Sequence, residues 1–427
     1  MASEAPLISR LADEISRNAG ILTEYLESHG LPQPSFDVDA PSHPIPETDD
    51  RLSAARRALI EATQSLHDLA VGPAETTRLF CFPEIYLLGA VQVLCHFNVP
   101  QNVPRTGDIG IPELAAKTGL SETLLARFLR MAATSHYFVE PRPGFVAHTA
   151  WSVALATDEK MRQCVWFRHA EMMPAVAKLV EAVRSYPDSH EPQRAAFAVA
   201  FGGDTFWDYK EKHPEHMVRF GQFVDAFASG HVVDSPQNIA RAYPWERLEE
   251  GSLVVDVGGG LGHISVAVAK EHPNLMFQVQ DFEDLAGESA ELVERNGLAG
   301  RVSFAPHDFF GEQPARGAKV YLLRNILHNW SDRYCRRILK PLVEAMGPDS
   351  RIVVCDIVLP PPNTMPKTQE ARIRALDLTM LSMFNAKERS LEEWQALFAS
   401  VDGRLKIENV IGRPKMRMDC LIEVRLA

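Results

Sequence analysis

A glycine-rich stretch, DVGGGLG at residues 256–262, follows a short apolar run. Glycines at such a point let the backbone turn sharply and let a ligand approach the first turn of the next helix. A dinucleotide-binding loop would want glycine where His263 stands, and here an acid precedes the glycines. Asp256 would repel a pyrophosphate but suits the cationic amino acid part of S-adenosylmethionine. The loop therefore predicts a site for that cofactor, involving Asp256, Gly258 and Gly260.

Two further strand-like runs end in groups that suit the rest of this cofactor. Asp281 closes the second run, where a carboxylate accepts both ribose hydroxyls. Asp308 and Phe309 close the third run, where an acceptor for the adenine amino group and a flat apolar surface for its ring are needed. Because the carboxyl ends of parallel strands share one rim, we expect these residues to line one crevice with the glycines. For Asp281, a helix cap or a solvated acid remains the alternative.

The fourth strand-like run leads into LRNILHNWSD at residues 323–332, which puts His328 on the same rim. A hydroxyl with a pKa of about 10 must lose its proton as it attacks a methyl carbon, and imidazole accepts a proton near neutral pH. Ser331 or Asp332 is expected to cap the helix that follows. His328 is therefore predicted to be the general base of a methyl transfer to a hydroxyl group.

An imidazole base works best when a carboxylate fixes its tautomer and stabilises the imidazolium that it becomes. Two carboxylates are candidates for this role. Asp356 follows the apolar run at residues 351–355, and Glu388 lies just before a helix that begins with a capping box from Ser390 to Glu393. For Glu388, a first-turn acid with no catalytic part remains the alternative.

The elements that must position these residues alternate between strand and helix from Ser252 onward. Such alternation predicts an α/β fold with a mostly parallel, doubly wound sheet. Residues 405–427 instead read as two strands around Gly412-Arg413-Pro414, an antiparallel hairpin at the sheet edge. The five strand-like runs are LVVDV, FQVQDF, VSFAPHD, KVYLLRNIL and RIVVCDIVLP.

The N-terminal part is predicted to be mostly helical. Helices are expected over Leu7 to Leu26, over Asp50 to about Leu69 and, as one apolar stretch, over Glu75 to Leu94. IPELAAKTG and SETLLARFLRMAATS then form two helices joined at Thr118-Gly119, and YFVEPRPGFVAHT forms a hairpin, which together predict a winged helix-turn-helix. The second of these two helices offers few basic residues, so a packing or dimerisation module is favoured over a DNA reader. The leading helix cannot bury its own face and should pack on the body or on a second copy.

Residues 161–247 are mostly helical and rich in aromatic side chains, which precede the catalytic unit. Core packing is the simpler interpretation of any one of them. As a group, some are expected to line a pocket for a small-molecule acceptor. The predicted pocket walls are Trp207, Phe223, Met380, Met383 and Phe384.

Length and composition limit the number of domains, the class of partner and the location that the sequence allows. The 427 residues exceed one hydrophobic core, and four segments are predicted: 1–72, 73–158, 159–250 and 251–427. A net charge of −12 argues against nucleic acid. No apolar run approaches the roughly 18 residues of a membrane span, and acids interrupt the first helix, so the sequence predicts a cytoplasmic protein. The six cysteines form no C-x-x-C pair, so no zinc site or disulfide framework is expected.

From about Pro73 to the C-terminus the chain resembles the plant and fungal small-molecule O-methyltransferases of the caffeic acid O-methyltransferase type. The motifs DVGGGLG, QDF, HDFF, LLRNILHNWSD, VVCDIVLP and NAKERSLEEW stand in the family order. The resemblance implies a class I S-adenosylmethionine-dependent methyltransferase domain, a winged-helix dimerisation domain, a homodimer and no metal. His328 is implied as the base, beside the carboxylates of Asp356 and Glu388. The residues implied to hold the cofactor are Gly258, Asp281, Asp308, Phe309 and Arg324.

The long segment before residue 70 and the wording LRNILH resemble enzymes of fungal aromatic polyketide pathways. Three features depart from the family pattern. Asn329 stands where the family usually has aspartate, Asp356 stands where it usually has glutamate, and the loop from Asp281 to Asp308 is longer than in plant members.

Two competing functions are weighed against methyl transfer. Some proteins that resemble this family use the same pocket for dehydration or pericyclic rearrangement, but the retained His328, Asp356 and Glu388 favour transfer. A regulator built on the winged helix is the third possibility, which the acidic balance disfavours.

Overall fold

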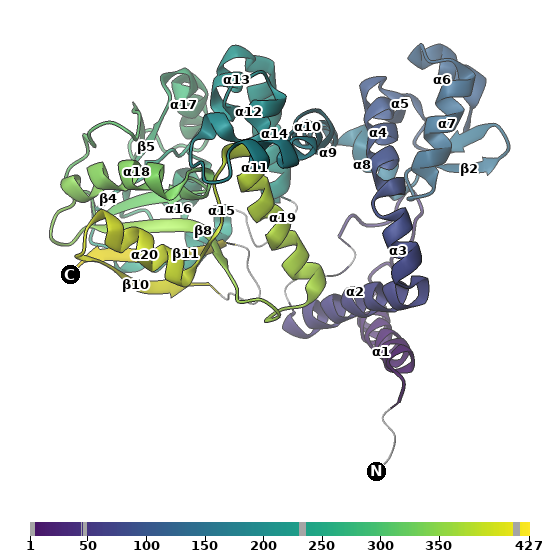
Figure 1. Cartoon of the computed structure of the whole chain (residues 1–427), viewed down its shortest axis with the longest axis horizontal. Helices are drawn as coiled ribbons and strands as arrows, with labels where there is room; N and C mark the ends of the chain where they lie inside the picture. The colour runs from purple at the N-terminus through teal and green to yellow at the C-terminus, as the bar shows by residue number, and fades with distance from the viewer. Residues whose placement is uncertain (1–4, 44, 46–48, 230–235, 413–418) are drawn as a thin grey trace. The chain divides into compact units, whose positions relative to one another are not determined.

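The computed structural model describes residues 5–43, 45, 49–229, 236–412 and 419–427 (Figure 1). The chain divides into two compact units. The first contains Met1–Met173, Glu215–Phe227 and Pro366–Thr368. The second contains Pro174–Pro214, Ala228–Met365 and Gln369–Ala427. The contacts therefore divide the predicted segment 159–250 between both units.

The second unit is built on one sheet with the strand order β10-β11-β8-β7-β4-β5-β6. The five strands from β8 to β6 run parallel, whereas β11 and β10 join β8 antiparallel as a C-terminal hairpin. This confirms the predicted sheet, although the predicted turn at Arg413 and Pro414 lies outside the described residues. The strands are β4 (Leu253–Val257), β5 (Met276–Asp281), β6 (Val302–Pro306), β7 (Val320–Arg324), β8 (Arg351–Leu359), β9 (Arg389–Ser390), β10 (Leu405–Ile411) and β11 (Asp419–Leu426).

Helices cover both faces of this sheet (Figure 1). Consecutive strand residues alternate between the two faces, so Val254 packs with α15, α16 and α17 while Val255 packs with α18 and α20. A strand buried on both faces reads as a continuous apolar run, which is why these strands were predictable. The helices of this unit are α10 (Met173–Ala177), α11 (Leu179–Ser185), α12 (Ala196–Ala200), α13 (Phe206–Lys212), α15 (Pro236–Ala242), α16 (His263–Glu271), α17 (Ala286–Arg295), α18 (Asp332–Ala345), α19 (Lys367–Phe384) and α20 (Leu391–Val401).

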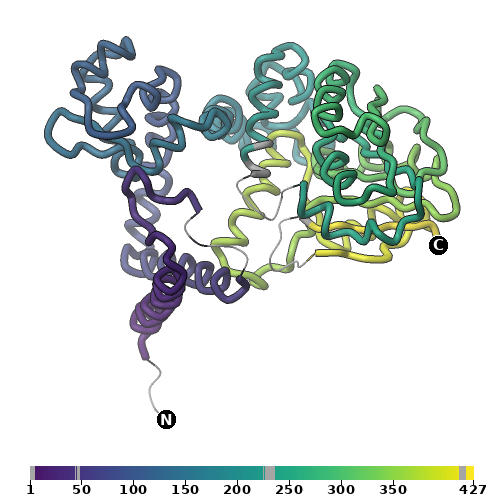
Figure 2. The backbone as a smooth tube through the Cα atoms, turned by 180° about the vertical axis from the view of Figure 1, so that it is seen from behind, coloured from purple at the N-terminus to yellow at the C-terminus, as the bar shows by residue number. Residues whose placement is uncertain are grey.

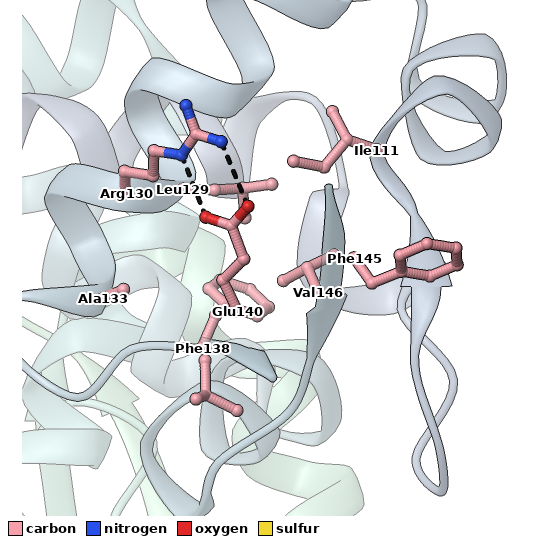
Figure 3. A pocket seen from close by; sticks show the side chains of 9 residues that line it. Ile111, Leu129, Arg130, Ala133, Phe138, Glu140, Phe145 and Val146 are labelled. Carbon is pink, nitrogen blue, oxygen red and sulfur yellow. Dashed lines mark hydrogen bonds and ion pairs between the residues drawn. The ribbon is translucent and has the colours of Figure 1, made fainter. Parts of the chain in front are cut away.

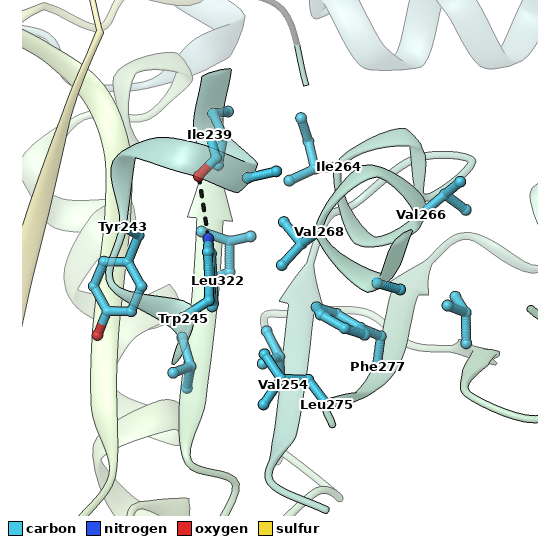
Figure 4. Close-up of a cluster of buried hydrophobic side chains, with 14 of the residues drawn as sticks. Ile239, Tyr243, Trp245, Val254, Ile264, Val266, Val268, Leu275, Phe277 and Leu322 are labelled. Carbon is cyan, nitrogen blue, oxygen red and sulfur yellow. Dashed lines mark hydrogen bonds between the residues drawn. The ribbon is translucent and has the colours of Figure 1, made fainter. Parts of the chain in front are cut away.

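One of the two sheet faces is anchored by Trp245 (Figure 4). Its indole N–H donates to the carbonyl oxygen of Ile239 at 3.1 Å, and its ring packs among Val254, Phe277 and Leu322. The indole is fully buried and its one donor is satisfied, so it stabilises the core at no hydrogen-bonding cost. This core fixes the strands whose carboxyl ends carry the predicted site.

The first unit is mostly helical, as predicted. Helices α1 and α2 pack side by side through a small apolar cluster that includes Leu22, Leu26 and Leu52, so the leading helix finds its partner within the chain (Figures 1 and 2). The helices are α1 (Leu7–Ser28), α2 (Asp50–Val71), α3 (Pro73–Leu79), α4 (Phe82–His96), α5 (Val99–Asn102), α6 (Ile111–Thr118), α7 (Glu122–Ala133), α8 (Ala150–Thr157), α9 (Glu159–Phe167) and α14 (Pro214–Ser229). A short sheet joins β1 (Ile109–Gly110), β2 (Val139–Arg142) and β3 (Phe145–Ala147) in the order β1-β3-β2.

Helices α6 and α7 and the hairpin of β2 and β3 occupy the predicted positions. Gly119 ends α6 in a left-handed conformation, with φ of 75°, which glycine adopts without strain. Arg130 on α7 holds the hairpin by donating to both carboxylate oxygens of Glu140 on β2, at 2.9 and 3.0 Å (Figure 3). The space beside them is only about 10 Å³, room for about one water molecule. This space is therefore too small for a larger ligand.

The single helix predicted over Glu75 to Leu94 is wrong. Cys81 adopts a left-handed conformation, with φ of 55°, and separates α3 from α4. Pro83 lies in the first turn of α4, where a missing N–H costs nothing. The described helical stretch Pro73–His96 is long and apolar enough, by length and composition alone, to cross a membrane, contrary to the expectation that no segment approached that limit. Neither α3 nor α4 alone reaches the roughly 20 residues that a spanning helix needs.

Candidate active site

The glycine-rich loop leaves β4 as predicted and is held by its neighbour β5. The N–H groups of Gly258 and Gly259 both donate to the carbonyl oxygen of Gln280, at 2.8 and 3.1 Å. Gly258 and Gly262 have positive φ, 68° and 88°. A Cβ at Gly258 would lie 2.6 Å from Cδ1 of Ile326, and one at Gly262 would lie 2.7 Å from a methyl group of Val279. Only glycine fits these two positions, so the loop presents its backbone to the crevice.

Asp256 lies underneath this loop. Its side chain is buried, accepts a hydrogen bond from the Ser265 hydroxyl at 2.7 Å, and would be 2.6 Å from a Cβ at Gly259. Burial raises the pKa of Asp256 to about 6, although Ser265 and the positive charge of Arg324 oppose the rise. The geometry shows a carboxylate that supports the loop from below. Its predicted direct contact with the cofactor stays a prediction.

Asp281 is the last residue of β5 and lies beside the loop. One carboxylate oxygen accepts the N–H of Gly260 at 2.7 Å and the other accepts its neighbouring N–H, of Phe282, at 2.8 Å. Each oxygen keeps a second lone pair, so the group can still accept hydroxyl donors as predicted for the ribose. Burial raises its pKa, although the two N–H donors oppose the rise. A Cβ at Gly260 would meet nothing within 4 Å, so the loop has an open side at this residue.

The predicted adenine edge lies on the same rim. Asp308 is exposed, and one of its oxygens accepts the N–H of Phe310 at 2.9 Å. Phe309 is half-buried, and its ring would lie 3.6 Å from a Cβ at Gly258. Arg324 ends β7 close enough to Asp256 to influence its pKa. The structure thus gathers the predicted cofactor residues along the carboxyl ends of β4, β5, β6 and β7.

His328 lies in a short 3-10 turn, Leu327–Asn329, after β7. Its Nδ1 is 2.9 Å from Oε1 of Glu388, and the side chains are 15% and 1% exposed. An ionised carboxylate only accepts hydrogen bonds, so we assign the proton of the neutral ring to Nδ1. Nε2 is then the nitrogen whose lone pair can accept a proton. The pair therefore has the geometry of a general base with its orienting carboxylate.

Asp356, the other predicted partner of the base, is fully buried in β8. Its backbone pairs with Cys420 on β11, and its charge acts on Arg389 and Cys335. The contact observed for Nδ1 of His328 is with Glu388. The role of Asp356 beside the imidazole stays a prediction.

The chain matches the model of an O-methyltransferase domain over residues 177–402. It is 35% identical to O-methyltransferase bik3 of Gibberella fujikuroi over 422 residues, 97% of this chain and 92% of that protein. The chain belongs to this O-methyltransferase family. S-adenosylmethionine, predicted from the glycine loop, is the cofactor of the family.

Two solved structures show how widely the fold of this O-methyltransferase is shared. The crystal structure of OxaC is 22% identical with a TM-score of 0.80, and the match covers 98% of this chain and 99% of that one. A structure described as a pericyclic reaction enzyme is 21% identical with a TM-score of 0.73, covering 97% and 100%. At these identities the likeness confirms the class I methyltransferase fold alone.

The structure of this O-methyltransferase brings four of the five predicted pocket walls into the second unit. The ring of Phe384 lies 5.9 Å from that of Trp207 and 4.9 Å from that of Phe206, between centroids. Met380 and Met383 are buried on the same helix, α19, and Met380 lies one turn before Phe384. Phe223 belongs to the first unit, where it stacks on Phe167 at 4.3 Å. The role of all five as acceptor contacts stays a prediction.

Two polar residues that hold the pair of His328 and Glu388 were not predicted from the sequence. Asp377 on α19 accepts the N–H of Glu388 at 3.0 Å, and burial raises its pKa. Arg389 is fully buried and donates to carbonyl oxygens on both sides of His328. A signal for Arg389 was present, because it stands next to Glu388 in the motif NAKERSLEEW. For Asp377, which stands in a helix without a motif around it, the sequence offered none.

Proposed function

We propose that this O-methyltransferase methylates a phenolic or enolic hydroxyl of a small aromatic, polyketide-derived molecule, with His328 as the general base. One observation carries the proposal: a partly exposed imidazole on the cofactor rim whose Nδ1 lies 2.9 Å from a buried carboxylate, Glu388. Such a carboxylate holds the ring with Nε2 as the proton acceptor and stabilises the imidazolium that forms.

The chain's own residues divide the work of the reaction. S-adenosylmethionine supplies, when bound, a methyl group on a positively charged sulfur. Nε2 of His328 accepts the proton of the acceptor hydroxyl as its oxygen attacks the methyl carbon. Glu388 balances the resulting positive charge on the ring. The glycine loop and Asp281 position the cofactor, and the predicted pocket walls position the acceptor. This positioning is the largest contribution expected in such a transfer.

The acceptor class rests on the pocket walls and on the relatives. The rings of Trp207 and Phe384 lie near each other, and the two methionines of α19 are buried on the same helix as Phe384. Apolar and aromatic side chains of this kind suit a flat ring. The named relative, O-methyltransferase bik3, comes from a fungus, which supports the predicted place in fungal secondary metabolism. A screen of phenols and enolic polyketides read by mass spectrometry tests this class. Methylation confined to amines or carboxylic acids would contradict it.

We also propose a cytoplasmic homodimer formed through the N-terminal helices. The large apolar side chains of Phe80, Phe82, Ile85 and Tyr86, around the break between α3 and α4, are each more than half exposed. A second copy of the chain would cover them. Light scattering at micromolar concentration tests the dimer, and a particle of monomer mass alone would contradict it.

The test of methyl transfer uses S-adenosylmethionine labelled in its methyl group, candidate phenols and two variants. The wild type should place label in the product. His328→Ala should lower turnover by about 10³-fold or more, since general base catalysis contributes on that order, while cofactor affinity stays within about threefold. His307→Ala is the matched control: it changes a histidine on the same rim that follows β6, and it should keep turnover within about threefold.

The same experiment separates the competing chemistry. Substrate that is consumed without gain of label would indicate dehydration or pericyclic rearrangement. Labelled product at near wild-type rate from His328→Ala would leave the transfer intact and overturn the assignment of the base.

A further inference from the structure

Arg389 lies directly after Glu388 and reaches the backbone of the turn that carries His328. It is on β9, which pairs with the end of β8 through Val358. Its Nη1 donates to the carbonyl oxygen of Leu327 at 3.0 Å, and its Nη2 donates to that of Trp330 at 2.8 Å. These two carbonyl groups stand on either side of His328 and Asn329. One side chain therefore holds both ends of the turn.

The guanidinium is itself held in place. Its Nε donates to Oδ1 of Asp332 at 2.9 Å, and its Nη2 forms an ion pair with the same oxygen at 2.7 Å. Burial opposes its charge, but Cys335, Asp332 and Asp356 raise its pKa above the ordinary value. The contacts at this position need a permanently charged side chain with several N–H donors in one plane. The guanidinium of arginine has such donors, whereas the ammonium of lysine does not.

The turn is a single short 3-10 turn, Leu327–Asn329, so its own backbone hydrogen bonds join only a few residues and contacts from outside add to its support. Asn325, just before it, has a positive φ of 53°, which asparagine tolerates better than most residues. Within the turn, the Asn329 amide donates to the carbonyl oxygen of Asn325 at 2.9 Å. The Cys335 thiol also donates to the two carbonyl oxygens that Arg389 binds, at 3.2 Å each. A thiol is a weak, neutral donor, whereas hydrogen bonds from a buried charged donor are about twice as strong as neutral ones, so the Arg389 contacts dominate.

We propose that Arg389 is a positioning residue for the base: Glu388 fixes the imidazole ring of His328, and Arg389 fixes the backbone that delivers the ring. Two adjacent side chains, Glu388 just before β9 and Arg389 at its first position, thus set the orientation of the base from two directions. The inference rests on the proposed function of His328. It assigns Arg389 no contact with cofactor or acceptor.

The test compares Arg389→Lys with Arg351→Lys. Arg351 is a matched control, since it is a mostly buried arginine on β8 paired with Glu423 at 3.0 Å. Arg389→Lys should lower kcat by about 30-fold, because small displacements of a base are costly, while KM for the acceptor and the cofactor Kd change by less than about threefold. Arg351→Lys should keep kcat within about threefold of the wild type. Equal losses in both variants would show a general cost of replacing buried arginine and would overturn the proposal.

Hydrogen exchange read by mass spectrometry gives a second measure that needs no turnover. In Arg389→Lys, exchange should rise by about tenfold in peptides covering residues 325–331 and stay at the wild-type rate in peptides covering β4. If the wild type transfers no methyl group, the proposed function fails, and the exchange result still decides whether Arg389 holds the turn. Exchange unchanged at 325–331, or raised throughout the second unit, would overturn the positioning role.

Asp332→Asn keeps the test decisive if Arg389→Lys does not fold. Its side chain is 41% exposed, so the substitution leaves the core intact. It removes the charge that orients the guanidinium, together with a longer, 3.7 Å ion pair to the half-exposed Lys387. The same local rise in exchange is expected, with a smaller fall in kcat of about threefold to tenfold. Wild-type kcat and wild-type exchange in Asp332→Asn would contradict the proposal.

Discussion

The glycine loop and the turn of His328 meet at one crevice but are held in opposite ways. The loop keeps its shape because side chains are missing: a Cβ at Gly258, Gly259 or Gly262 would collide with the groups packed against it. The turn keeps its shape because side chains are present, since Glu388 and Arg389, at the start of β9, reach it from about sixty residues later in the chain. The difference teaches that the proposed cofactor binding and the proposed proton transfer rest on separate supports. Each can be damaged without the other.

Of the substitutions that test this comparison, loss of the carboxylate beside the proposed base should have the largest effect on turnover. Glu388→Gln keeps the shape of the side chain but lets Nδ1 of His328 face an amide that no longer requires the proton there. Turnover should fall by about 10²-fold, with cofactor affinity within about threefold. Steady-state kinetics and calorimetric titration of S-adenosylmethionine measure the two quantities. A parallel loss of both would mean that the two supports are not separate.

A substitution in the glycine loop should have the opposite result, a larger effect on cofactor affinity than on turnover. In Gly262→Ala the new Cβ would lie 2.7 Å from Val279 at a φ of 88°, so the backbone must shift. We expect the cofactor Kd to rise by about tenfold to thirtyfold, because a left-handed residue and a close contact each cost on the order of 1 kcal/mol. Turnover at saturating cofactor should fall less than the affinity does. Gly260→Ala is the control, since its Cβ would meet nothing within 4 Å and only the φ of 57° is unfavourable.

The smallest expected effect is a change in how the free energy of unfolding depends on pH when Asp256 is replaced. Burial raises the pKa of Asp256 to about 6, so the folded state holds its proton more tightly than the unfolded state does. The group therefore destabilises the fold as pH rises from about 4 to about 6. Asp256→Asn removes this cost and should gain stability relative to the wild type, by about 1 kcal/mol more at pH 7.5 than at pH 5. Urea denaturation at the two pH values measures the gain, and a constant difference would contradict the raised pKa.

Much of the second unit could be predicted from sequence because its signals are local. Each parallel strand is an apolar run, and the glycines after β4 mark the loop without knowledge of any partner. The capping box from Ser390 to Glu393 is also local and is confirmed. The residues of the rim could be predicted together with the strands, because they lie at or just after the carboxyl ends of those strands.

The features that could not be predicted depend on contacts between residues far apart in the chain, which the hydrophobic periodicity does not indicate. Ser331 occupies the N-cap position of α18, but its hydroxyl donates to the carbonyl oxygen of His190 instead of capping the helix. The break at Cys81 is hidden in an apolar run that continues on both sides. The clamp by Arg389 joins residues that only the fold brings together.

Ile326 is the side chain that touches both regions. It stands two residues before His328, and its Cδ1 fills the space where a Cβ at Gly258 would lie. Positions 258 and 326 are therefore linked: a side chain at 258 would displace Ile326 and, two residues later, His328. A smaller residue at 326 would remove that clash but not the strain of a φ of 68° at Gly258.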